Sequence, residues 1–152
     1  MMSPAGGRHG QIAHRLAQSL GNYVEPNGLG TVFAAETGFV LSRNPDTVRA
    51  PDVAFVRQDR MAALDDISGF VPLAPDLVAE VITPGDRFSE VEEKTWFWIQ
   101  SGVRAVLVVD PANRLVRICR PPREIVLLDV STELAVDDVV PGWRLNVAEL
   151  FG

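Results

Sequence analysis

Cysteine, lysine and long apolar runs are scarce in this sequence, and each shortage excludes a class of protein. The single cysteine, Cys119, can form no intramolecular disulfide and no cysteine-cluster zinc site. No apolar run approaches the ~20 residues that a membrane-spanning helix needs, and residues 1–10 lack the apolar region of a signal peptide. We therefore expect a cytoplasmic protein that does not enter a membrane.

Positive charge is scarce as well. The chain has 14 Lys and Arg residues against 20 Asp and Glu residues, a net charge of −6, which argues against a dedicated basic nucleic-acid binder. Residues 52–103 contain four basic and ten acidic residues, so this middle third accounts for the whole imbalance. Lys94 is the only lysine, because the other thirteen basic residues are arginines.

The remaining composition is that of an ordinary globular domain. The 152 residues are 47% hydrophobic and 22% charged, and one domain usually has ~100–200 residues. The chain contains no internal repeat and no linker that would divide it. We therefore expect a single domain over residues 1–152, which can bury a core without a disulfide or a structural metal.

Apolar spacing and turn residues predict a mixed α/β domain. Apolar residues three to four apart predict an amphipathic helix, and runs rich in β-branched residues predict strands. The sequence RNPDT is typical of a turn, so the strands before and after it should pair antiparallel. The predicted elements are a helix at 10–24, strands at 31–41, 51–56 and 76–83, a helix at 90–101, a strand at 104–111, and a C-terminal hairpin, short strand and helical turn.

The second helix carries start and stop signals. Ser89 followed by Glu92 predicts a capping box, and Gly102 predicts the C-terminus. The strand, helix and strand that follow one another here predict a crossover between parallel strands. The partly acidic segment 57–75 lies between two predicted strands, and we expect it to form a long loop with one helical turn.

Two carboxylates fall on apolar strands. Glu80 interrupts the strand predicted at 76–83, and Asp52 opens the run DVAFV; a buried charge is unfavourable unless it is paired or binds a metal. If the two strands pair antiparallel with Val56 opposite Asp76, then Asp52 lies opposite Glu80, with Cβ atoms about 4.5–5.5 Å apart on one face. Such a pair becomes favourable when a divalent cation binds between the carboxylates.

Asp76 and Glu36 are weaker candidates for this site. Asp76 lies four residues before Glu80, roughly 13 Å along a strand, so initiating the strand is its simpler role. A hairpin about residues 42–50 places Glu36 near Val56, and only a bend would bring it to the site. We keep both residues as candidates that would contact the metal ligands without binding the metal themselves.

Lys94 supplies a positive charge close to the same place. It lies in the second turn of the helix that follows the Glu80 strand, so the crossover can return it to the end of that strand. An ammonium group there can position a water near a metal ion and stabilise negative charge on a phosphate. The alternative is a helix-surface ion pair with Glu90, four residues earlier.

These residues resemble a known family. Asp52 in a Pro-Asp pair, Glu80 in PDLVAEV and Lys94 in EVEEK occur in the order of the PD-(D/E)XK nuclease superfamily. The chain looks most like the bacterial Uma-type branch of restriction-endonuclease-like proteins. The superfamily's usual lysine lies two residues after the strand acid, where this sequence has Ile82, so Lys94 on the helix would replace it. The matching segments are HG at 9–10, ETGF at 36–39, RAPDVAFV at 49–56, APDLVAEVITPGDR at 74–87, EVEEK at 90–94, SGVR at 101–104 and VVDP at 108–111.

The resemblance implies a mixed sheet flanked by helices and hydrolysis of phosphodiester bonds. It implies DNA as the substrate and Mg²⁺ as the cofactor, with Mn²⁺ as a substitute. Asp52 and Glu80 would bind the metal with a carbonyl of Val81 or Ile82, and Lys94 would act on the water or the phosphate. A homodimer could assemble a basic cleft from Arg8, Arg15, Arg117, Arg120 and Arg123.

A second hypothesis is a non-catalytic interaction protein that keeps the fold, because a fold does not determine a function. Several conspicuous residues have structural explanations on sequence alone. His9 and His14 are poorly spaced for binding a metal from one helix. Trp96, Phe97 and Trp98 point around their helix, so we assign them to the core with one interface contact.

Overall fold

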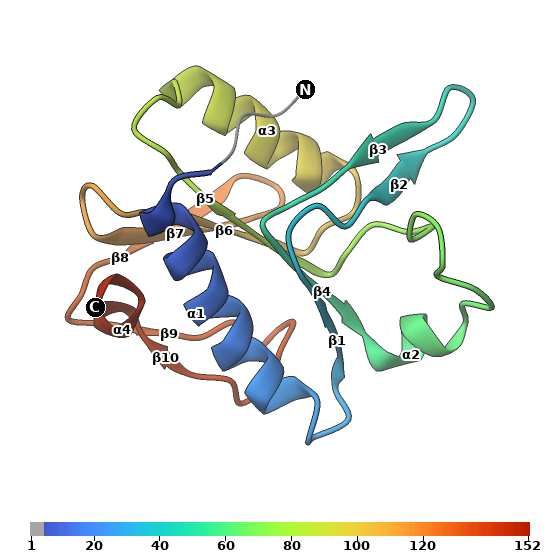
Figure 1. Ribbon diagram of the computed structural model, residues 1–152, viewed down its shortest axis with the longest axis horizontal. Helices are drawn as coiled ribbons and strands as arrows, with labels where there is room; N and C mark the ends of the chain where they lie inside the picture. The colour runs from blue at the N-terminus through green and yellow to red at the C-terminus, as the bar shows by residue number, and fades with distance from the viewer. Residues whose placement is uncertain (1–4) are drawn as a thin grey trace.

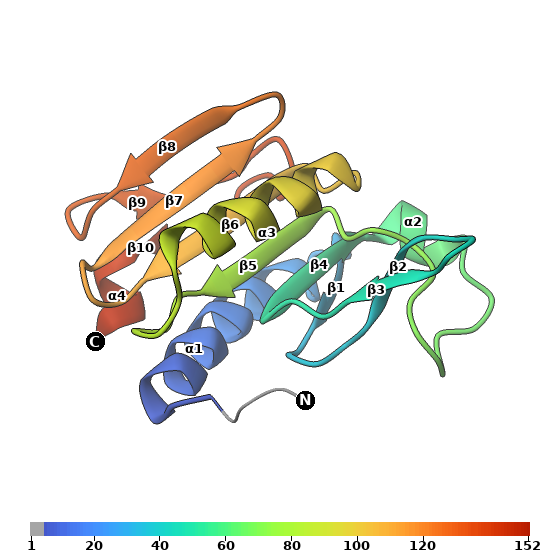
Figure 2. The same ribbon diagram turned by 90° about the horizontal axis from the view of Figure 1, so that it is seen from above.

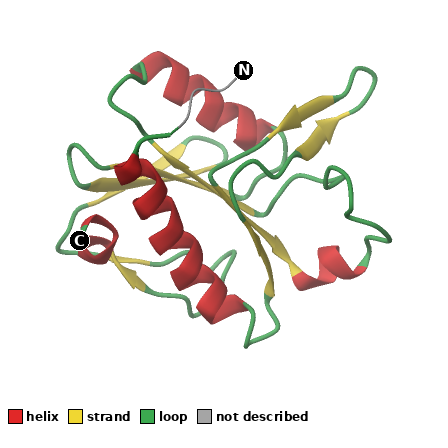
Figure 3. Cartoon of the chain, in the orientation of Figure 1, coloured by secondary structure: helices red, strands yellow, loops and turns green. Residues whose placement is uncertain are grey.

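The computed structural model describes residues 5–152, which form a six-stranded mixed sheet with helices on both faces (Figure 1; helices red and strands yellow in Figure 3). This confirms the predicted mixed α/β domain with a mixed sheet flanked by helices. The strand order is β1-β4-β5-β6-β7-β8, in which β5 and β6 pair parallel and the other neighbours pair antiparallel. The strands are β1 (Gly30–Phe33), β4 (Val53–Arg57), β5 (Leu77–Val81), β6 (Ala105–Asp110), β7 (Leu115–Arg120) and β8 (Glu124–Leu128).

The helix α1 (Gly7–Val24) covers one face of the sheet, as its apolar spacing predicts. Ile12, Leu16, Leu20 and Val24 are buried, and their spacing of four places them on one side of the helix. They pack in the main core with inward-facing residues of the central strands. None of the helices in residues 5–152 combines the length and apolar character that crossing a membrane requires.

The helix α3 (Phe88–Gln100) covers the opposite face (Figure 2). Its Trp96 and Trp98 are buried in a cluster that includes Val78 of β5. The helix ends before Gly102, whose φ of +109° suits a glycine at this position and confirms the predicted stop. The β5–α3–β6 connection joins two parallel neighbours, which confirms the predicted crossover.

The segment predicted as one strand over 31–41 is divided. Its first part forms β1, which pairs with β4, whereas β2 (Phe39–Ser42) pairs with β3 (Thr47–Arg49) around the RNPDT turn. Between the two parts lies a turn with Glu36 at a φ of 68°, a backbone conformation that strands do not contain. The single strand was therefore wrong, and so was the register that placed Glu36 near Val56.

The start of α3 also differs from the prediction. Its N-cap residue is Arg87, and no side chain caps the helix, so the capping box of Ser89 and Glu92 was wrong. The Glu92 carboxylate instead forms an ion pair with Arg117 of β7. The partly acidic segment 57–75 does carry one short helix, α2 (Gln58–Ala62), as predicted.

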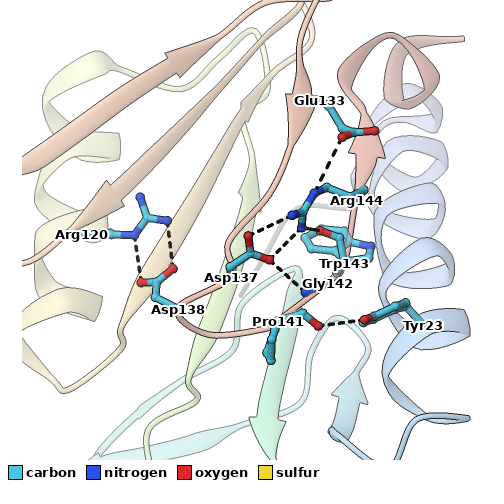
Figure 4. A network of polar contacts seen from close by, with 9 residues as sticks. All are labelled: Tyr23, Arg120, Glu133, Asp137, Asp138, Pro141, Gly142, Trp143 and Arg144. Atoms are coloured by element: carbon cyan, nitrogen blue, oxygen red, sulfur yellow. Dashed lines mark hydrogen bonds and ion pairs between the residues drawn. The ribbon is translucent and has the colours of Figure 1, made fainter.

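Polar contacts fix the C-terminal segment beside α1 (Figure 4). Arg144 donates two hydrogen bonds to Asp137, 2.8 and 3.0 Å long. The hydroxyl of Tyr23 on α1 donates to the carbonyl of Pro141 over 2.8 Å. These contacts order a chain segment that has little regular secondary structure of its own. Its elements are β9 (Glu133–Leu134), β10 (Leu145–Asn146) and the terminal helix α4 (Val147–Phe151).

Candidate active site

The candidate site lies where β4 begins and β5 ends. The two strands pair Val53 with Ala79, so the same register places Asp52 opposite Glu80 one position further on, as the sequence predicts. Side chains alternate along a strand, and both carboxylates therefore share the sheet face of Val78, which α3 covers.

Two donors hold the Asp52 carboxylate. Its Oδ2 accepts a hydrogen bond of 2.8 Å from the backbone N–H of Val81, and Nε2 of His9 lies 3.1 Å from the same oxygen. An ionised carboxylate only accepts hydrogen bonds, so the imidazole is the donor. The start of α1 and the end of β5 thus orient Asp52 from two sides.

The Glu80 carboxylate is largely buried, and the positive charge near it does not compensate for the loss of contact with water. Its Oε2 lies 3.1 Å from Nζ of Lys94, and its Oε1 accepts a hydrogen bond of 3.3 Å from Nε1 of Trp98. Burial raises the pKa of Glu80 from 4.5 to about 7; the Lys94 charge lowers this pKa, and repulsion by Asp52 raises it. Near neutral pH the site therefore favours either a proton or an additional cation.

Lys94 reaches the site from the second turn of α3, as predicted. Its side chain is 51% exposed, whereas the Glu80 side chain is 13% exposed, so the ammonium group bridges solvent and the buried carboxylate. The competing interpretation was a surface ion pair with Glu90. Glu90 lies instead 3.6 Å from Arg87, and Lys94 contacts Glu80.

Two residues of the site were missed by the reasoning from sequence. His9 was set aside because it is poorly spaced from His14 for binding a metal, although the segment HG at 9–10 belongs to the family resemblance and could have indicated it. Trp98 was assigned to the core, where it is indeed buried. Its spacing of four from Lys94 places both residues on one side of α3, which was the available signal that it also faces Glu80.

Asp76 and Glu36 lie elsewhere. Asp76 precedes β5 at the opposite end from Glu80, where its Oδ2 accepts the backbone N–H of Arg57 over 2.8 Å and its Oδ1 lies 3.1 Å from Arg60. It is 3% exposed, so it is a buried structural anchor. Glu36 occupies the exposed turn after β1.

The arginines that could form a basic cleft are largely engaged within the chain. Arg120 binds Asp138 through two hydrogen bonds of 3.0 Å (Figure 4). Arg117 pairs with Glu92, and Arg15 donates to a backbone carbonyl of α4. These three arginines therefore bind groups of the same chain rather than forming a basic cleft.

A pocket of about 150 Å³ opens beside Glu80 and Lys94. The end of β5, the loop after it and the first turns of α3 form its walls. Both strand-end residues whose carbonyls could serve as ligands line it. The lining residues are Glu80, Val81, Ile82, Asp86, Glu90, Val91, Lys94 and Thr95.

The donors present fit a hard divalent cation. Within residues 5–152 there is no cluster of three or more His, Cys, Asp or Glu side chains that could hold a metal by themselves. Two carboxylates and a strand-end carbonyl suit Mg²⁺, which keeps several of its waters. The raised pKa of Glu80 supports this fit, because a cation between the carboxylates would compensate the charge that burial leaves unbalanced.

The central strands β4 and β5 bring two carboxylates together at one end of the mixed sheet, and α3 brings Lys94 to them. The mixed sheet with helices on both faces is that of a restriction-endonuclease-like α+β domain. The chain belongs to the Uma2 family, described as "Putative restriction endonuclease", whose model matches residues 1–148.

A solved structure shares this fold, namely the crystal structure of a putative nuclease belonging to DUF820 from Anabaena variabilis. The two chains are 20% identical, the match covers 99% of this chain and 84% of that one, and the TM-score is 0.86. At this identity the likeness establishes the fold alone. No curated protein matches the chain.

Proposed function

We propose that the chain is a divalent-metal-dependent nuclease that hydrolyses phosphodiester bonds in DNA. The observation that carries the proposal is the contact between Lys94 and Glu80 next to Asp52, at the ends of two central strands. Membership of the Uma2 family supports a nuclease-like function. The metal ion, the DNA substrate and the roles of the site residues are part of what we propose.

Asp52 and Glu80 would hold Mg²⁺, or Mn²⁺ in its place, together with the carbonyl of Val81 or Ile82. When bound, the ion would supply positive charge for the phosphate oxygens and for a coordinated water. The chain supplies the orientation of the ligands. His9 and the Val81 N–H fix Asp52, and Trp98 fixes one oxygen of Glu80.

Lys94 would act on the water or on the phosphate. Its Nζ is already within 3.1 Å of a proposed ligand oxygen, and its exposed half faces solvent. An ammonium group at this position stabilises the negative charge that develops on a phosphate during hydrolysis. A compact point charge suits this role better than the planar guanidinium of the arginines elsewhere in the chain.

Arg49 is our candidate for binding a neighbouring phosphate. It lies three residues before Asp52, and its exposed guanidinium stacks 5.2 Å from the ring centre of Phe97, one helical turn beyond Lys94. Among the described residues no carboxylate forms an ion pair with it. A guanidinium held over a ring can bind a phosphate with two hydrogen bonds.

Cleavage assays test the proposal. The protein is incubated at low salt with plasmid DNA, single-stranded DNA and RNA, with Mg²⁺, Mn²⁺ or EDTA. We expect metal-dependent cleavage of DNA that falls at least ~100-fold in Glu80→Ala and in Lys94→Met. Glu93→Gln is the control, because this exposed glutamate adjoins Lys94 in sequence and should leave cleavage unchanged.

Three outcomes would contradict the proposal, the last of them only in part. Cleavage that survives in both variants would point to a contaminating nuclease. Absence of cleavage with every metal and nucleic acid would favour the second hypothesis, a non-catalytic interaction protein with this fold. Cleavage of RNA alone would overturn the assignment of DNA and keep the metal site.

A further inference from the structure

The strand β8 forms one edge of the six-stranded sheet. It pairs with β7 on its inner side, and in residues 5–152 no strand pairs with its outer side, which is open in Figure 2. The outer side of an edge strand presents unpaired backbone N–H and C=O groups that can pair with another strand.

Apart from Glu124 at its first position, β8 lacks the features by which monomeric proteins protect edge strands. Ile125 is 49% exposed, Val126 38% and Leu127 59%. From Ile125 to Leu128 the strand carries no charge and no proline, and its register with β7 is regular, without a bulge. Charged residues, prolines, bulges or a covering segment usually prevent association at such an edge.

The sequence around β8 is complementary to itself. An antiparallel pairing of two copies centred on Val126 places Ile125 opposite Leu127 within the strand, and Arg123 opposite Asp129 in the residues that flank it. A two-fold axis makes each of these contacts twice. Opposite charges and apolar pairs facing each other across strands are both stabilising.

Neighbouring registers lack this complementarity. A shift of the register by one residue would set residues of opposite sheet faces against each other, which an antiparallel pair does not allow. A shift by two residues places Arg123 opposite Leu127, or Asp129 opposite Ile125. The register centred on Val126 is therefore the favoured one.

We propose that β8 pairs with β8 of a second copy of this chain, so that two six-stranded sheets join into one. Ile125 faces the same side as Cys119 of β7, which belongs to the cluster under α3. Ile125 and Leu127 of both copies thus meet on the α3 face of the joined sheet. The proposal does not depend on nuclease activity, and it needs no basic cleft.

Sedimentation velocity over about 1–100 µM protein tests the proposal. The wild type should sediment with twice the mass of one chain. Leu127→Lys and Ile125→Lys should weaken dimerisation at least ~100-fold, because each places charge in the centre of the interface. Ile67→Lys is the matched control, since Ile67 is an equally exposed apolar residue on the loop after α2, and this variant should remain dimeric.

A charge reversal tests the register. Arg123→Glu should weaken the dimer, and the double variant Arg123→Glu/Asp129→Lys should restore it. A monomeric wild type at 100 µM would overturn the proposal and leave the edge to a different partner. A dimer that persists in both lysine variants would overturn the assignment to β8. Loss in Arg123→Glu without recovery in the double variant would overturn the register.

Discussion

At the residue scale, burial disfavours the charged form of Glu80. It is nearly buried, and its neighbours include one cation and one further carboxylate. Without a cation, two ionised carboxylates close together repel each other, and this repulsion destabilises the site. On the proposed function, this imbalance is the property that would make the site bind a divalent ion.

The pKa of Glu80 has a consequence for the free energy of unfolding without metal. Because burial raises this pKa from 4.5 to about 7, the folded protein binds more protons than the unfolded chain between these values, and stability falls as pH rises through this range. Glu80→Gln should remove this loss, so its advantage over the wild type should grow from near zero at pH 4.5 to at most about 3 kcal/mol above pH 7.

Urea unfolding of both proteins in EDTA at pH 5, 6, 7 and 8 measures this difference. The subtraction removes the contribution of other titrating groups, which both proteins share. A difference between Glu80→Gln and wild type that does not change with pH would contradict the assignment of a raised pKa to Glu80.

Mg²⁺ should stabilise the protein more at pH 8 than at pH 6. Protons and the cation compete for Glu80, and a ligand that binds only the folded state raises the unfolding temperature more, the more tightly it binds at a given concentration. Thermal unfolding with and without Mg²⁺ measures the shift. Asp52→Asn should abolish it, and Glu36→Gln, in an exposed turn, should preserve it. A shift that survives in Asp52→Asn would place the ion elsewhere.

The sequence was enough to place Asp52, Glu80 and Lys94 together because the strand register and the crossover follow from local sequence patterns. Strand alternation and one antiparallel register were enough to place Asp52 opposite Glu80, and one crossover brought Lys94 to them. His9 could not be placed in the same way. Its contact with Asp52 joins residues 43 positions apart, and it depends on how α1 packs across the sheet, which periodicity does not determine.

At the scale of elements, the end of β4 and the start of β5 are joined by a buried polar anchor. Asp76 accepts the backbone N–H of Arg57 and pairs with Arg60 of α2. Asp76→Ala would leave a buried N–H unsatisfied and remove the partner of Arg60. We expect it to lower the free energy of unfolding by about 2–4 kcal/mol.

Chemical denaturation measures this loss, and Arg60→Ala should have a smaller effect because the arginine is partly exposed. The Mg²⁺-induced shift of Asp76→Ala should equal that of the wild type as long as the variant folds. Loss of this shift in a folded Asp76→Ala protein would contradict a purely structural role.

The order and type of most elements could be predicted, but two local details could not. Residues 31–41 are rich in strand-forming side chains, and only the turn around Glu36 divides them. Ser89 has the sequence pattern of a cap, but α3 begins one residue earlier, and Glu92 pairs with Arg117. In both places tertiary contacts determine the local structure more strongly than the local pattern does.

At the scale of the whole molecule, the net charge of −6 shapes how the protein would meet DNA. The acidic excess lies in residues 52–103, the segment that contains Asp52, Glu80 and Lys94. Repulsion of the phosphate backbone would make binding weak without a divalent cation. Few free arginines compensate for it, and Arg49 is the one closest in sequence to the site.

Arg49→Ala should therefore raise KM for DNA about tenfold and leave kcat within a factor of two, because it removes a phosphate contact away from the reacting bond. The steady-state rate over a range of DNA concentrations measures both constants. Arg43→Ala, at the tip of the β2–β3 hairpin and paired with Asp46, is the matched control. An equal effect of both substitutions would show that total charge, rather than position, governs binding.

The central claim is that Asp52 and Glu80 together bind one divalent ion. A crystal structure of the protein soaked in Mn²⁺, with the ion located by its anomalous scattering, tests this claim most directly. We expect one ion about 2 Å from a carboxylate oxygen of each residue, and no ion in Asp52→Asn crystals. A fully soaked wild-type crystal without an ion between these carboxylates, with Lys94 still on Glu80, would contradict the claim.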